Sequence, residues 1–141
     1  MDQENKIRVV VAEDYSGLSA VMHKLIDNTS DLQCCGRFGT GKETLEALKE
    51  LKPDVVSLDL SMPEMNGFAV LKKIREEWPE VRCIVFSGFG EHEYVRQALE
   101  AGAHGYVFKG DFEEFIECLR EAAAGRRFLS SRFRDVDNLP A

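Results

Sequence analysis

The sequence has no apolar run close to the roughly 20 residues that a helix needs to cross a membrane. It begins with the polar stretch MDQENKIR, which lacks the apolar core of a signal peptide. We therefore expect a cytoplasmic protein with no attachment to a membrane. A chain of 141 residues, 44% hydrophobic and 30% charged, suffices for one domain whose core needs neither disulfides nor a structural metal.

Basic residues are in short supply. The chain has 18 Lys and Arg against 25 Asp and Glu, which gives a formal net charge of −7. Proteins that bind a nucleic-acid backbone neutralise its phosphates with Lys and Arg, so this balance argues against direct nucleic-acid binding. The excess of carboxylates is compatible with binding divalent cations.

Cysteines are few, and their spacing matches neither a metal site nor a redox pair. The four are Cys34, Cys35, Cys83 and Cys118, which form no CxxC motif and have no His at a metal-site spacing. Most of them lie in or beside apolar runs. We interpret them as small buried hydrophobic residues in a reducing compartment.

The hydrophobic pattern predicts five strands, each followed by a helix. Short β-branched apolar runs indicate buried strands, and apolar residues spaced by three and four indicate helix faces. The predicted strands span 7–12, 32–38, 54–60, 81–87 and 105–108. The predicted helices span 16–28, 40–51, 67–77, 91–101 and 111–124.

This alternation predicts an α/β fold, a doubly wound parallel sheet with helices on both faces. In such sheets ligands bind at the carboxyl ends of the strands. The predicted domain covers residues 1–125. Residues 126–141 lack clear periodicity and carry four arginines, so we interpret them as a tail or the start of a linker.

Polar side chains follow four of the predicted strands. Glu13 and Asp14 come after the first, Asp59 lies at the carboxyl end of the third, Ser87 ends the fourth and Lys109 follows the fifth. Each has an ordinary explanation alone: Asp14 as a helix cap, Ser87 as a turn residue and Lys109 as a solvated lysine. Their joint placement at one edge of the sheet is what indicates a functional site.

Three carboxylates at one edge repel each other and raise each other's pKa unless a cation lies among them. A hard divalent ion with oxygen ligands, Mg²⁺, fits such a site. Asp59 would then attack phosphorus as a nucleophile and form an acyl phosphate. The Lys109 ammonium would balance the phosphoryl charge, and the Ser87 hydroxyl would donate a hydrogen bond to the attached phosphate.

At these residues the sequence resembles the receiver domain of bacterial two-component response regulators, a CheY-like family. The acidic pair lies in VVVAEDYSGL, Asp59 in PDVVSLDLSMPEMNGF, Ser87 in CIVFSG and Lys109 in GYVFKG. The resemblance covers roughly residues 6–125. It implies a (βα)5 flavodoxin-like fold with strand order 2-1-3-4-5. The implied function is a signalling switch rather than a metabolic enzyme.

The resemblance also implies a chemistry and a set of partners. A histidine kinase or phosphotransfer protein would donate a phosphoryl group to Asp59, and the domain would promote its own phosphorylation and dephosphorylation. The implied Mg²⁺ ligands are Asp14, Asp59 and the main-chain carbonyl of Ser61, with Glu13 acting directly or through water.

The implied switch joins Ser87 to an aromatic ring. Ser87 moves toward the phosphate, and the ring of Tyr106 turns inward. This remodels the face made by the fourth helix, fifth strand and fifth helix, through which the chain would form a homodimer.

Two residues depart from the family pattern. Gly110 follows Lys109 where the family often has a proline with a cis peptide bond. A cis bond before a non-proline residue costs about 3 kcal/mol, so we predict a trans bond. The acidic pair is Glu-Asp rather than the commoner Asp-Asp.

The stretches GAHGYVFKGD and AAAGRRFLSSRF resemble the receivers that precede a LuxR/NarL-type DNA-binding domain. Two interpretations follow. The chain is the receiver part of a transcription regulator, which contacts DNA only through an output domain outside this sequence. Alternatively, it is a stand-alone receiver that acts by protein contacts. A degenerate receiver that is never phosphorylated is a separate hypothesis, and the presence of all five residue types argues against it.

Two other classes use a similar fold or a similar aspartate. A haloacid-dehalogenase-like phosphatase needs a second acid two residues after its nucleophile, where this sequence has Ser61. A flavodoxin-like flavin-binding module needs a loop rich in glycine and hydroxyl groups after the first strand, and here that loop is acidic. Both interpretations are therefore weaker than the receiver.

Overall fold

The computed structural model describes residues 5–136, and it confirms the predicted alternation of strands and helices. A short sixth strand and a 3₁₀ helix follow the last α-helix. The strands are β1 (Ile7–Ala12), β2 (Leu32–Phe38), β3 (Val55–Leu58), β4 (Arg82–Ser87), β5 (Gly105–Phe108) and β6 (Phe128–Leu129). The helices are α1 (Ser16–Asp27), α2 (Gly41–Leu51), α3 (Gly67–Glu77), α4 (His92–Glu100), α5 (Phe112–Ala123) and the 3₁₀ helix η2 (Ser131–Phe133).

All strand pairs in the sheet are parallel, and the order is β2-β1-β3-β4-β5-β6. This is the predicted flavodoxin-like order with one strand added beside β5. The added strand lies in residues that the sequence pattern assigned to a tail or linker. A strand of two residues is too short to show a period of two, so the pattern contained no sign of it.

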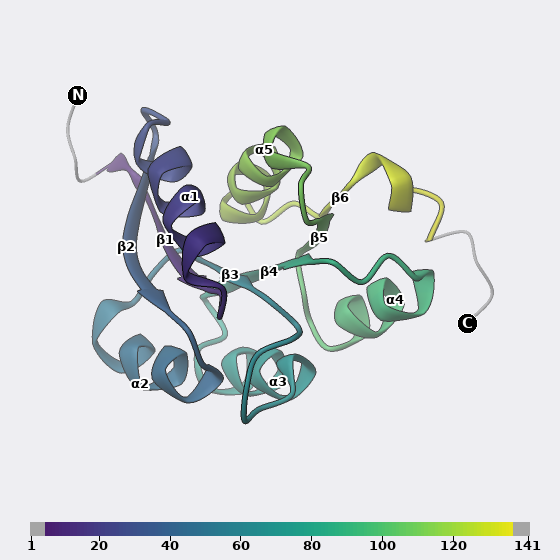
Figure 1. Cartoon of the computed structure of the whole chain (residues 1–141), viewed down its shortest axis with the longest axis horizontal. Helices are drawn as coiled ribbons and strands as arrows, with labels where there is room; N and C mark the ends of the chain where they lie inside the picture. Colours follow the sequence, from purple (N-terminus) through teal and green to yellow (C-terminus); the bar gives the residue numbers. More distant parts are fainter. Residues whose placement is uncertain (1–4, 137–141) are drawn as a thin grey trace.

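The helices cover both faces of the sheet. Figure 1 shows α1 and α5 on one face and α2, α3 and α4 on the other. Successive side chains of β1 therefore enter different cores. Val9 and Val11 pack with Met22 beneath α1 and α5, whereas Val10 packs with Leu71 on the opposite face. All five side chains are almost fully buried.

Local chemistry sets where α2 and α3 begin. The Thr40 hydroxyl accepts a hydrogen bond from the Glu43 N–H at 3.1 Å, and the Asn66 side chain accepts one from the Phe68 N–H at 2.8 Å. These side chains satisfy amide groups that the first turn leaves unpaired. Gly67 follows Asn66 because a Cβ there would lie 2.5 Å from a backbone atom of the preceding loop.

The Lys109–Gly110 peptide bond is trans, as predicted. Gly110 has a φ of +103°, a conformation that favours glycine. All four cysteines are free thiols. Cys83 and Cys118 are buried as predicted, and burial raises the pKa of Cys83 to about 12, whereas Cys34 and Cys35 are only half-buried. Between residues 5 and 136, no helix combines the length and the apolar character needed to cross a membrane.

Candidate functional site

The sheet itself holds the polar residues that follow its strands. The Asp59 N–H donates to the Ala12 carbonyl at 3.0 Å, and the Lys109 N–H donates to the Ser87 carbonyl at 2.8 Å. These hydrogen bonds continue the strand pairing one residue beyond β3 and β5. The backbone of both functional residues is therefore fixed by the sheet rather than by a loop.

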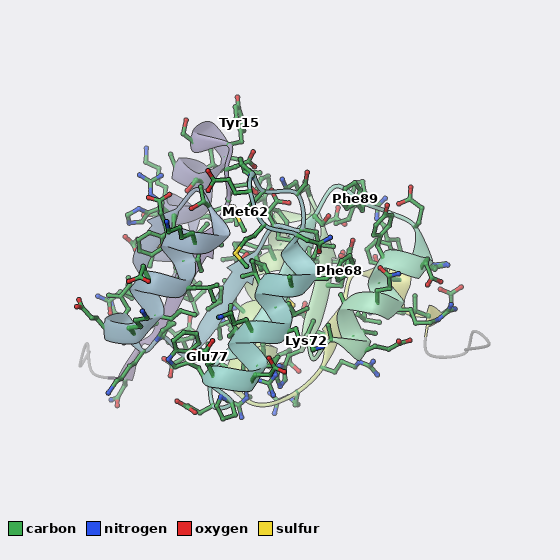
Figure 2. All side chains as sticks on the ribbon, turned by 90° about the horizontal axis from the view of Figure 1, so that it is seen from below. Tyr15, Met62, Phe68, Lys72, Glu77 and Phe89 are labelled. Carbon is green, nitrogen blue, oxygen red and sulfur yellow. The ribbon has the colours of Figure 1, made fainter. Side chains whose placement is uncertain are left out.

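The loops after β1, β3 and β4 meet at one edge of the molecule. Figure 2 shows Tyr15, Met62 and Phe89, one from each loop, in the upper half of the view. Glu77, at the end of α3, lies in the lower half of the view. The carboxyl ends of the strands thus form a common rim, as the parallel fold predicts.

Three carboxylates converge at this rim. One oxygen from each of Glu13, Asp14 and Asp59 lies within 4.8 Å of the other two. Glu13 is 3% exposed and Asp59 is 2% exposed, whereas Asp14 is exposed to solvent. The cluster therefore has two buried members and one that faces water.

Lys109 is the cation that pairs with the buried carboxylates. Its Nζ lies 3.2 Å from Asp59 Oδ2 and 3.0 Å from Glu13 Oε1. The ammonium of Lys109, which follows β5, thus bridges the residues that follow β1 and β3. The sequence-predicted residues Glu13, Asp14, Asp59 and Lys109 are brought together in space.

The electrostatics favour a further cation. Burial raises the pKa of Asp59, and burial followed by the charge of Asp59 raises the pKa of Glu13. Burial lowers the pKa of Lys109, but the carboxylates of Asp59 and Glu13 raise it by a larger amount. The pKa of Lys109 is therefore raised overall. One ammonium does not offset the cost of burying two carboxylates beside a third.

The donor set fits Mg²⁺. Glu13 Oε1 is buried and accepts no hydrogen bond, although the Lys109 ammonium lies beside it. Carboxylate oxygens are the ligands that a hard divalent cation prefers, and Mg²⁺ takes one or two of them together with water. The cluster therefore has the chemistry of a magnesium site.

The loop after β3 returns tightly on itself beside Asp59. The Ser61 N–H donates to Asp59 Oδ1 at 3.1 Å, and Ser61 forms an antiparallel bridge with Asn66. Glu64, between them, has a φ of +73°. The loop thus holds the main chain of Ser61 next to the Asp59 carboxylate.

Ser87 lies on the same rim and is 1% exposed. Its Oγ accepts a hydrogen bond from the Phe89 N–H at 3.1 Å. The Tyr106 hydroxyl donates to the Phe89 carbonyl at 2.8 Å, and its ring is fully buried. Burial raises the pKa of Tyr106 to about 12, so this hydroxyl stays protonated at neutral pH. Phe89 therefore joins Ser87 to Tyr106 through its two backbone groups.

Residues 9–120 match the family model of the response regulator receiver domain. This match covers more than half of the chain. The chain belongs to the response regulator receiver domain family. The family acts in two-component signalling as a phosphorylation-controlled switch, and the resemblance noted in the sequence is thereby confirmed.

Relatives of this receiver include regulators of the NarL and LuxR type. The nitrate/nitrite response regulator NarL of Escherichia coli is 34% identical over 137 residues, which cover 96% of this chain and 63% of NarL. The receiver domain of NarL from Mycobacterium tuberculosis is 30% identical, with a TM-score of 0.82. The match covers 86% of this chain and 99% of that chain. A LuxR-family response regulator from Aurantimonas has a TM-score of 0.89 at 24% identity. The match covers 94% of this chain and 96% of that chain, which supports the fold. The receiver spans 58% to 63% of the length of the first curated relatives it matches.

Membership of the receiver family favours the signalling interpretation over the phosphatase and the flavin-binding module. The structure agrees on the decisive position. Ser61, where a phosphatase of the haloacid-dehalogenase class needs an acid, supplies only its main-chain N–H to Asp59.

The structure removes one ordinary explanation of the site residues and adds two contacts that sequence reasoning missed. Asp14 does not cap α1: Tyr15 stands at the cap position without a side-chain hydrogen bond, and Glu13 accepts the Tyr15 N–H at 3.1 Å. The bridging role of the Phe89 backbone was missed, because backbone hydrogen bonds leave no trace in residue identity. The contact of Phe133 with Tyr106 was missed because the residues around Phe133 lack periodicity.

Proposed function

We propose that this receiver domain accepts a phosphoryl group on Asp59 from a histidine kinase or phosphotransfer protein, with Mg²⁺ bound at the acidic cluster. The observation that carries the proposal is the convergence of Glu13, Asp14 and Asp59 within 4.8 Å, with Lys109 paired to the buried members. A buried carboxylate between a cation site and an ammonium is a suitable nucleophile for phosphorus.

The proposed reaction transfers the phosphoryl group from nitrogen to oxygen. An oxygen of Asp59 attacks phosphorus, the P–N bond of a phosphohistidine breaks, and the imidazole leaves with the bonding electrons. Lys109 stays within reach of the equatorial oxygens and offsets their charge. The residues that would hold Mg²⁺ are Asp14, Asp59 and the Ser61 main-chain carbonyl, with Glu13 binding directly or through water. Bound Mg²⁺ would supply positive charge to the phosphoryl oxygens.

The response to phosphorylation is proposed to use Ser87 and Tyr106. Ser87 Oγ accepts from the Phe89 N–H and its hydroxyl also interacts with the Tyr106 hydroxyl, so on phosphorylation the Ser87 proton would turn to a phosphate oxygen. Tyr106 already lies inward, with its hydroxyl on the Phe89 carbonyl. The proposed readout is the face made by α4, β5 and α5, which would also support a homodimer.

Its relatives support placing this receiver in a transcriptional response regulator, in which residues 126–141 lead toward a DNA-binding output domain. DNA would be contacted only through that domain. A stand-alone receiver that works by protein contacts is the second proposal. A cytoplasmic location remains a prediction in either case.

The test is phosphorylation by acetyl phosphate in the presence of Mg²⁺. Intact mass spectrometry should show the gain of one phosphoryl group, which Asp59→Asn abolishes and chelation of Mg²⁺ prevents. Asp54→Asn is the matched control, because Asp54 is exposed at the opposite end of the same strand and should label as the wild type does. Normal labelling of Asp59→Asn would show that the phosphate is attached elsewhere.

A further inference from the structure

Residues 128–136, here called the C-terminal segment, fold back against the sheet. β6 pairs with β5, and Figure 1 shows the chain then running from β6 toward α4. Three of its side chains are almost fully buried: Ser130 at 0%, Phe133 at 1% and Val136 at 3% exposed. A loose tail does not bury side chains to this degree, so the segment is part of the domain core.

Polar contacts tie the segment to its neighbours. Ser130 Oγ accepts a hydrogen bond from the Phe108 N–H at 3.0 Å, and the Arg132 guanidinium lies 4.0 Å from the centre of the Phe108 ring. Ion pairs link the segment to α5 and the residue that precedes it, Arg134–Glu114 and Arg132–Asp111, both at 3.6 Å. On the other side, His92 Nε2 of α4 lies 3.4 Å from Asp135 Oδ1. These contacts hold Phe133 in one place.

Phe133 packs against Tyr106. The two ring centres are 5.3 Å apart and the ring planes meet at 82°, the edge-to-face geometry that aromatic pairs favour. Phe133 thus restricts the Tyr106 ring to the position from which its hydroxyl reaches the Phe89 carbonyl. Phe89 in turn orients the Ser87 hydroxyl through its N–H. A continuous set of contacts runs from the C-terminal segment to the phosphorylation rim.

We infer that Phe133 is a positioning residue for phosphorylation at Asp59, acting through Tyr106 and Phe89 on the hydroxyl of Ser87. The inference rests on the proposed function. It gives the C-terminal segment a role beyond stability, because the ring that fills the core beside Tyr106 also prepares a donor for the phosphoryl group. Preorganised donors contribute more than donors that must first be oriented.

A phosphoryl mimic measures this effect separately from folding. The affinity for BeF₃⁻ in excess Mg²⁺ is determined by calorimetry for the wild type, Phe133→Leu and Phe128→Leu. Both substitutions replace one ring of the same segment with a smaller apolar side chain. Only Phe133 belongs to the core that contains Tyr106, whereas Phe128 packs in the core of the opposite face. Urea denaturation of each variant reports stability independently.

The expected result is a two- to tenfold loss of affinity in Phe133→Leu, roughly the contribution of one neutral hydrogen bond. Phe128→Leu should bind as tightly as the wild type. In a Ser87→Ala background Phe133→Leu should have no further effect, because the group through which Phe133 acts is gone. If Phe133 has a purely structural role, Phe133→Leu would lower stability, and the coupling energy between Phe133 and Ser87 in BeF₃⁻ binding would be zero.

Two kinds of failure are distinguishable. Three outcomes would overturn the inference about Phe133 and leave the proposed function standing. They are an unchanged affinity in Phe133→Leu, an equal loss of affinity in Phe128→Leu, and the same loss from Phe133→Leu whether or not Ser87 is present. If the wild type does not bind BeF₃⁻, or Asp59→Asn binds it equally well, the proposed function fails and the inference fails with it.

Discussion

Lys109→Met tests whether the acidic cluster depends on one positive charge. Lys109 Nζ lies 3.2 Å from Asp59 Oδ2 and 3.0 Å from Glu13 Oε1. The carboxylate side chains are 2% and 1% exposed, and the Lys109 side chain is 28% exposed. Methionine keeps the length and the apolar stem of lysine while removing its charge, so the change isolates the electrostatic contribution.

Removing one partner of a buried ion pair costs about 3–5 kcal/mol, because the remaining charge is left without compensation. Lys109 is partly exposed, so we expect a loss of about 3 kcal/mol in the free energy of unfolding at neutral pH without divalent cations. In excess Mg²⁺ the loss should fall below about 1 kcal/mol, since a cation bound only by the folded state supplies charge to the same carboxylates.

The loss should also shrink in acid. Burial raises the folded-state pKa of Asp59 and of Glu13, and removing the ammonium raises both further. As pH falls from neutral toward these raised values, the carboxyls take up protons in the folded state and their repulsion disappears. The penalty is therefore largest at neutral pH and decreases as the solution becomes acidic.

The assay is urea denaturation at about pH 7.5 and at about pH 5, each with EDTA or with Mg²⁺. The lower pH is near the ordinary range of carboxyl pKa values and the higher pH is well above it. Lys72→Met is the matched control, because Lys72 lies exposed on α3 (Figure 2) and should change stability by less than about 0.5 kcal/mol. An equal loss for Lys109→Met in all four conditions would refute the reasoning, since it would show that Lys109 contributes packing rather than charge.

Other predictions concern the rim and its metal. Gly67→Ala should displace the loop after β3 and cost about 1–3 kcal/mol, because the new Cβ would lie 2.5 Å from Leu60 Cα; urea denaturation measures this loss. Phe89→Glu, two residues after Ser87, should speed dephosphorylation by up to about tenfold, because the ring that stacks on Tyr94 at 4.6 Å is replaced by a charged group that attracts water. The decay of the phosphorylated mass measures this, and an unchanged or slower decay would contradict it. Mg²⁺ affinity should fall below neutral pH, because Asp59 and Glu13, whose pKa values are raised, bind protons in competition with the metal; calorimetry at two pH values measures this.

The architecture and the residues of the rim could be predicted from the pattern of residues along the chain. Alternating strand and helix patterns lead to a parallel sheet, and in a parallel sheet all carboxyl ends share one edge. Asp59 and Lys109 are 50 residues apart, yet their side chains meet at 3.2 Å because each follows a strand of that sheet. Residue type and strand position were enough to predict this meeting.

The contacts that connect the rim to the rest of the domain could not be predicted in this way, because they depend on packing. The Phe89 backbone joins Ser87 to Tyr106, and no residue type encodes a backbone hydrogen bond. The burial of Phe133 against Tyr106 depends on a strand of two residues, which has no periodicity to read. Contacts of this kind arise when side chains distant in sequence fill the same space, so they become visible only in the packed domain.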